Sequence, residues 1–201
     1  MAIALLLMAN AVILADVPRL LGFVAGLILM CLLPGYLAAR IVLPDQTSDW
    51  TERAVLTVGM GFGALVLGAL GLHYIPGPLG QAHLLILFDA ISVVLIVVEL
   101  FSSPRRQPAA PRHSTLHSLL PLALVLVAAF FRLANLGYSE FQGDESRAML
   151  MAAGVIRGED SILFLHRKGP VEILVPAAFY ALDGTTTELV GRAPFALASM
   201  A

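Results

Sequence analysis

Charged side chains are scarce in this sequence of 201 residues. Asp, Glu, Lys and Arg together make up 13% of the chain, whereas a soluble domain carries about 25%. Hydrophobic residues account for 59%, and the mean hydropathy is +0.88. The formal net charge of −2 leaves no basic surface of the kind that binds nucleic acid. These figures exclude an ordinary soluble domain and indicate a protein solvated mostly by lipid.

Cysteine and lysine are almost absent. The chain has one cysteine, Cys31, so an internal disulfide is excluded, and its place inside an apolar run favours a small packing residue. The only lysine is Lys168. A single lysine beside other basic residues draws attention to the segment that holds it.

Long apolar runs are abundant, and about 20 apolar residues suffice to cross a hydrocarbon core of roughly 30 Å. Four runs of that length lie at 20–43, 55–75, 82–101 and 118–136. The run at 2–15 is interpreted as a further span, because it lacks the basic start of a signal peptide. The runs at 171–182 and 188–201 are shorter, and the last reaches the end of the sequence without a polar terminus. We expect a longer protein.

The sequence predicts an all-α fold, a polytopic transmembrane helical bundle with an outer loop carrying short amphipathic helices. A linker at 102–117, rich in Pro, Ser and Arg and free of acids, separates an N-terminal unit of about four spans (1–101) from a second unit (118–201). Basic short loops stay on the cytoplasmic side. The chain is therefore expected to be an integral protein of the plasma (inner) membrane. The linker is placed on the cytoplasmic side, and the loop at 137–169 on the extracytoplasmic side.

The outer loop begins with a pair of acids. Gly143 breaks the chain, Asp144 is suited to cap a helix, and residues 145–157 favour an amphipathic helix ending at Gly158. Glu145 would then be a first-turn acid favoured by the helix dipole. Asp144 and Arg147 are three residues apart, so on a helix they share a face and could form a surface pair.

A basic cluster, His166, Arg167 and Lys168, lies just before Pro170, which can open the next helix. Such residues can anchor to lipid phosphate at the membrane edge. Together with Asp144 and Glu145 they could instead form a site in which an acid acts on an acceptor while cations hold an anionic leaving group.

From about Phe131 the sequence resembles the start of a GT-C membrane glycosyltransferase. It is closest in pattern to the protein O-mannosyltransferase group and its bacterial relative, the lipid A aminoarabinose transferase. The features that carry the resemblance are Arg132 near the end of a span, the Asp144-Glu145 pair with Arg147, Lys168 before Pro170, Gly184 in a turn, and "GRAPFALAS" in the last run. They cover roughly the last 70 residues.

The resemblance implies a hexosyl or pentosyl transfer with roles for five residues. Asp144 would be the general base that deprotonates the acceptor as it attacks the anomeric carbon with inversion, and Glu145 would orient the acceptor or contribute to a metal site. Arg147 and Lys168 match residues that contact the donor phosphate. His166 lies near a position where some members have a His before Pro-Pro, although Gly169 stands here where a Pro is common.

The resemblance also implies the partners, namely a polyprenyl-phosphate-linked sugar and membrane lipid, with no nucleic acid. The acceptor is open between a protein, a glycolipid and a cell-envelope polymer. Metal use differs across the superfamily, so a divalent metal cofactor is left open.

Two other function classes remain. Asp89 lies in the middle of an apolar run, where a carboxyl group is costly and is usually paired inside a bundle or functional, so a transporter subunit is one alternative. A non-catalytic scaffold or lipid-binding accessory protein is the other. The glycine-rich "GMGFGALVLG" at 59–68 has no strand before it and predicts close helix packing through Gly59 and Gly63 rather than a nucleotide loop.

Overall fold

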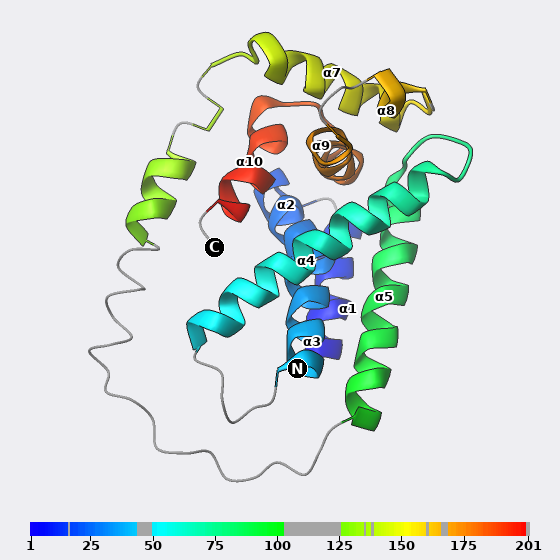
Figure 1. Ribbon diagram of the computed structural model, residues 1–201, viewed down its shortest axis with the longest axis vertical. Coiled ribbons are helices and arrows are strands. Elements are labelled where there is room, and N and C mark those ends of the chain that lie inside the picture. Colours follow the sequence, from blue (N-terminus) through cyan, green and yellow to red (C-terminus); the bar gives the residue numbers. More distant parts are fainter. Residues whose placement is uncertain are drawn as a thin grey trace.

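The computed structural model is all-helical over the residues it describes, which are 1–15, 17–43, 50–102, 126–134, 136–137, 139–159, 161–165 and 169–199. No strand occurs in these ranges. The helices are shown in Figure 1 and are α1 (Ala2–Leu14), α2 (Arg19–Leu27), the π-helical η1 (Ile28–Leu32), α3 (Leu33–Val42), α4 (Trp50–His73), α5 (Gln81–Ser102), α7 (Gly143–Ile156), α8 (Ile162–Leu165), α9 (Val171–Asp183) and α10 (Glu188–Ala198).

Three helices are long and apolar enough to cross a membrane. They cover Leu20–Val42, Thr51–His73 and Gln81–Phe101, close to the predicted runs at 20–43, 55–75 and 82–101. The helix within the run at 2–15 is α1, which has 13 residues and rises only about 20 Å at 1.5 Å per residue. Of the run at 118–136, residues 126–133 are helical, and 118–125 lie outside the described residues.

The first of the three long helices contains a π-helical turn, and its cause is Pro34 in the following turn. Proline has no backbone N–H, and its ring clashes with the carbonyl four residues earlier. For Pro34 this is the carbonyl of Met30, and a wider preceding turn moves it away from the ring. In this wider turn the N–H of Leu33 donates to the carbonyl of Ile28, five residues earlier. The helix therefore continues through Pro34 instead of ending there.

α3 and α4 approach each other closely through Gly35 and Gly61. A Cβ on Gly61 would overlap the carbonyl of Cys31, and a Cβ on Gly35 would overlap the carbonyl oxygen of Thr57. Close packing through the glycine-rich segment of α4 is confirmed, but the predicted residues were wrong. Gly59 and Gly63 have nothing within 4 Å of an added Cβ, because the rotation of α4 turns them away from α3.

α5 carries Asp89 at mid-helix, and α1 supplies a partner for it. The side-chain amide of Asn10 donates a 2.7 Å hydrogen bond to Oδ1 of Asp89 and a second, of 3.0 Å, to the carbonyl of Leu6. The expectation that Asp89 is paired is confirmed, and its side chain is half-buried between α1 and α5.

α9 joins the two units that the sequence suggested. Most of its residues from Ile173 to Tyr180 are almost fully buried, and one hydrophobic core includes side chains from both 1–101 and 137–199. The ring of Phe179 lies 5.0 Å from that of Phe23 in α2. Figure 1 shows α9 nearly end-on, surrounded by α2, α4, α5, α7 and α10. Residues 103–117 of the predicted linker lie outside the described residues.

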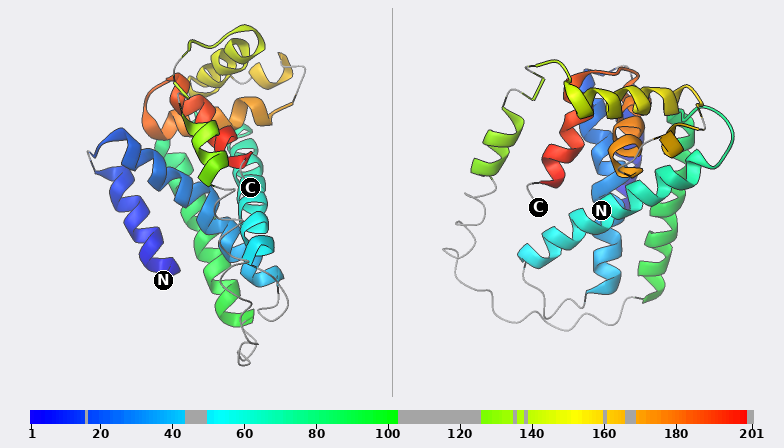
Figure 2. Two further views of the ribbon diagram at one scale, coloured as in Figure 1. Left: turned by 90° about the vertical axis from the view of Figure 1, so that its left-hand side faces the viewer. Right: turned by 45° about the horizontal axis from the view of Figure 1, so that its top comes forward.

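α7 and α8 lie across one end of the long helices, as both figures show (Figures 1 and 2). At the end of α7, the backbone of Gly158 lies against that of Gly77 and Pro78 in the turn between α4 and α5. The N–H of Leu79 also donates a 3.5 Å bond to the carbonyl of Val155. The segment 139–159 and the α4–α5 turn therefore share one end of the molecule, as the predicted topology requires.

Candidate functional site

The site lies where the chain turns into α7. Gly143 has a φ of +54°, in the left-handed region that a glycine adopts without strain, and the N–H of Glu145 bonds the carbonyl of Gln142 at 3.2 Å. α7 begins at Gly143 with Gln142 as its N-cap residue, and no side chain caps it. The prediction that Asp144 caps this helix was therefore wrong, because the sharp turn at Gly143 starts the helix before it. The predicted end at Gly158 is confirmed, with a φ of +85° there.

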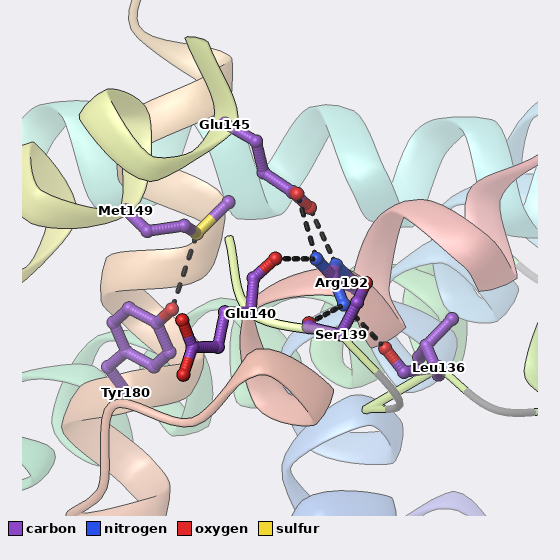
Figure 3. A network of polar contacts seen from close by, with 7 residues as sticks. All are labelled: Leu136, Ser139, Glu140, Glu145, Met149, Tyr180 and Arg192. Atoms are coloured by element: carbon purple, nitrogen blue, oxygen red, sulfur yellow. Dashed lines mark hydrogen bonds and ion pairs between the residues drawn. The ribbon is translucent and has the colours of Figure 1, made fainter. Parts of the chain in front are cut away.

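Arg192 of α10 binds Glu145 in a bidentate ion pair (Figure 3). Nε of Arg192 donates to Oε1 of Glu145 at 2.7 Å, and Nη2 donates to Oε2 at 2.9 Å. Side-chain exposure is 18% for Arg192 and 37% for Glu145. A planar guanidinium and a carboxylate matched in this way form one of the stronger polar contacts in proteins. The hydrogen bond from Arg192 is the main reason that the pKa of Glu145 is lowered.

Arg192 also holds the segment that leads into α7. It donates to the carbonyls of Leu136 at 3.0 Å, Ser139 at 2.8 Å and Glu140 at 3.4 Å. Its guanidinium carbon lies 5.0 Å from the centre of the Phe141 ring, within the range of a cation–π contact. One side chain thus fixes both the backbone before Asp144 and the carboxylate after it.

Three residues pack tightly beside the ion pair, namely Tyr180, Met149 and Gly191. The Tyr180 hydroxyl donates a 3.3 Å hydrogen bond to the sulfur of Met149 (Figure 3). A Cβ on Gly191 would lie 2.5 Å from that hydroxyl and 2.9 Å from the sulfur. Glycine before Arg192 therefore lets α10 approach α7 and α9 closely enough for Arg192 to reach Glu145.

Asp144 and Arg147 are both exposed on α7. The structure thus places Asp144, Glu145 and Arg147 in one helical turn at the end of the molecule, as predicted, and gives Glu145 a partner from α10. Lys168 and His166 lie outside the described residues, so the meeting of the two clusters stays a prediction. Across the described ranges, no group of three His, Cys, Asp or Glu side chains gathers as a metal site, and both oxygens of Glu145 are bound to Arg192.

Arg192 was missed as a site residue, although the sequence contains a signal for it. It is the only charged residue in the apolar stretch from Leu189 to Ala201, and a lone arginine in such a stretch usually has a partner. No local sequence pattern identifies that partner, Glu145, which is 47 residues away.

Comparison of the chain with protein-family profiles, with curated proteins and with solved structures gives no match.

Proposed function

We propose that this chain is a polytopic membrane glycosyltransferase of the GT-C type. It would move a sugar from a polyprenyl-phosphate donor to an acceptor at the extracytoplasmic face of the plasma (inner) membrane. The observation that carries the proposal is the surroundings of the two adjacent acids. Glu145 is held by Arg192, and its neighbour Asp144 is exposed to solvent on the same helix, which lies across the end of the apolar helices.

This position suits the chemistry. A polyprenyl donor keeps its tail in the bilayer while its phosphate and sugar reach the surface, so a reacting carboxylate must stand at the boundary between hydrocarbon and water. A base must also be held in place, because catalysis depends on a fixed geometry. The contacts of Arg192 with Ser139, Glu140 and Glu145 restrain the backbone on both sides of Asp144.

In the proposed reaction Asp144 takes the proton of an acceptor hydroxyl. The oxygen bonds to the anomeric carbon as the bond from that carbon to the phosphate oxygen breaks, and the electron pair leaves on polyprenyl phosphate. Arg147 and Lys168 would stabilise the released anion, and His166 would lie beside them. Glu145, held by Arg192, would orient the acceptor side of the site, and a divalent metal is left open.

The test is transfer of labelled sugar from a polyprenyl-phosphate donor in membranes containing the chain. We expect Asp144→Asn to lower transfer by about 100-fold or more, the usual contribution of a general base. Glu159→Gln is the matched control, because Glu159 is an acid at the opposite end of α7 that pairs with Arg157. Transfer by Asp144→Asn at the wild-type rate, with equal protein in the membrane, would reject Asp144 as the base and favour a scaffold.

A further inference from the structure

A polar pair lies between α1 and α5, within the apolar part of the molecule. Asp89 is eight residues into the candidate span Gln81–Phe101, so it lies about 12 Å from one end of that span and about 18 Å from the other. Its side chain is half-buried, and its Oδ1 accepts the 2.7 Å hydrogen bond from the amide of Asn10. Asp89 therefore lies at the depth of hydrocarbon if α5 crosses the membrane.

The carboxylate of Asp89 has no cationic partner among the described residues. Its one polar contact there is with the neutral amide of Asn10, and α1 carries no ionisable side chain. Arg40 of α3 is bound to Glu99 at 2.7 Å. The other ionisable side chains described on α5 and on the helices that pack against it make no hydrogen bond or ion pair with Asp89, and they are Cys31, Tyr36, Glu52, Arg53, His73, His83, Glu172, Tyr180 and Asp183. A carboxylate without a counter-charge is costly in hydrocarbon.

Ser92 supplies a second polar group on the same side of α5. Its side chain is 0% exposed, and its hydroxyl oxygen has no hydrogen-bond partner in the described part of the chain. Gln81 and Asp89 are the residues of α5 whose side chains bond α1, and Gln81 reaches the carbonyl of Ile13 at 3.4 Å. At 3.6 residues per turn, Ser92 lies about 20° round the helix from Gln81 and about 60° from Asp89. Ser92 thus belongs to the face of α5 that meets α1.

The polar atoms at this depth include more acceptors than donors. The amide nitrogen of Asn10 donates both to Asp89 and to the carbonyl of Leu6 at 3.0 Å, which uses its two hydrogens. The second carboxylate oxygen of Asp89, the amide oxygen of Asn10 and the hydroxyl of Ser92 receive no hydrogen bond from the described residues. Oxygen atoms of these kinds hold small cations inside membrane proteins. One bound cation would balance the charge and occupy these oxygens together.

We propose that Asp89, Asn10 and Ser92 form a binding site for one monovalent cation between α1 and α5. Na⁺ and a proton share the chemistry that the site recognises, a single positive charge held by oxygen atoms. The site gives a function to the N-terminal unit. It does not depend on the proposed glycosyl transfer, because no sugar or lipid phosphate is involved.

The experiment uses the whole chain in vesicles and dicyclohexylcarbodiimide, an apolar reagent that modifies protonated carboxyl groups. A nitrogen of the reagent takes the carboxyl proton, a carboxyl oxygen bonds to the central carbon, and the product rearranges to a stable N-acylurea. A water-soluble carbodiimide is the second probe. In Na⁺-free buffer at neutral pH, we expect an adduct on Asp89 from the apolar reagent and little from the water-soluble one. Glu99 is the internal control on the same helix and should react much less, because Arg40 already balances its charge at 2.7 Å.

Two titrations identify the cation. Saturable protection of Asp89 by NaCl, but not by choline chloride at equal ionic strength, would assign Na⁺, and at about ten times its dissociation constant Na⁺ should lower labelling about tenfold. Labelling that is unaffected by NaCl and falls only as the pH is raised would assign a proton. Equal labelling by the two carbodiimides would place Asp89 in water and overturn the proposal.

An infrared difference spectrum gives an answer that needs no reagent. The spectrum of Asp89→Asn is subtracted from that of the wild type in Na⁺-free buffer, and we expect the C=O band of a protonated carboxyl group. Absence of this band would mean that the carboxylate of Asp89 persists without a bound cation, and would overturn the proposal.

Ser92→Ala tests the hydroxyl as a ligand. It should shift the midpoint of the NaCl or pH titration of Asp89 about tenfold in cation concentration, the effect of losing one contact with a charged group. Val93→Ala is the matched control, because Val93 is the next residue of α5 and is 49% exposed. A midpoint that is the same in Ser92→Ala and Val93→Ala would overturn the place of Ser92 in the site.

Discussion

Arg192 in α10 and Glu145 in α7 hold together two helices whose paired residues are 47 positions apart, through contacts of 2.7 and 2.9 Å. The same guanidinium donates hydrogen bonds to three backbone carbonyls, so it connects the segment before α7 with α10. Loss of this one side chain would release both the acid pair and the segment before it.

Replacing Arg192 should therefore destabilise the protein. We expect Arg192→Ala to lower the free energy of unfolding by on the order of 2 kcal/mol, because a carboxylate and several carbonyls lose a charged donor. Arg192→Lys should recover only part of the lost free energy of unfolding, since an ammonium group cannot make the bidentate contact. The measurement is thermal unfolding in detergent.

A double-mutant cycle isolates the ion pair. Glu145→Gln and Arg192→Ala should couple by about 1 kcal/mol or more. The matched control is the pair Arg157 and Glu159 at the other end of α7, whose side chains are 64% and 50% exposed, and which should couple by less than about 0.5 kcal/mol. Equal coupling in the two cycles would show that Arg192 has no special part in holding α7.

Stability should also depend on pH through Glu145. Its pKa is lowered in the folded protein, chiefly by the hydrogen bond from Arg192. The stabilisation is fully present above the unfolded-state pKa of about 4.3 and is lost as the pH falls through the lower folded-state pKa. We expect the Tm of the wild type to drop below about pH 4 more than that of Glu145→Gln. Parallel curves for the two proteins would contradict this.

Glycines of α4 should differ sharply in their tolerance of alanine. Gly61→Ala places a methyl group against the carbonyl of Cys31, and we expect a cost of about 3 kcal/mol or more from overpacking. Gly59→Ala and Gly63→Ala meet open space and should be neutral or slightly stabilising, because alanine favours a helix. Comparing the Tm of the three variants tests this, and similar values would contradict the assigned rotation of α4.

Asn10 should stabilise the contact between α1 and α5. Asn10→Ala removes the 2.7 Å hydrogen bond to Asp89, and such bonds between apolar helices contribute about 1 kcal/mol. Met8→Ala is a control on the same helix, because Met8 is 55% exposed. Asp89→Asn keeps an oxygen acceptor and should cost less than Asn10→Ala. An equal change in Tm for Met8→Ala and Asn10→Ala would show that the hydrogen bond to Asp89 makes no specific contribution to stability.

The long helices were predictable from the sequence because they depend on local composition. α4 and α5 match the runs at 55–75 and 82–101 within about five residues. The end of α7 at Gly158 follows from a position that needs a left-handed φ.

Contacts between distant segments were not predictable in this way. Three glycines alternate at 59, 61 and 63, and which of them faces α3 depends on the rotation of α4, which is set by packing. The partner of Glu145 belongs to a helix 47 residues on, and nothing near either residue encodes the pairing. The sequence could indicate Asp144, Glu145 and Arg147 as neighbours on one helix, but not that Glu145 binds Arg192.

The buried position of α9 has a consequence for biogenesis. Its neighbours α2, α4 and α5 all precede it in the chain, so during synthesis they leave the ribosome first. When α9 is synthesised, three of the helices that pack against it are already present. Its apolar side chains can therefore be buried as soon as the helix forms. The order of the chain therefore shelters its most deeply buried helix from aggregation as it is made.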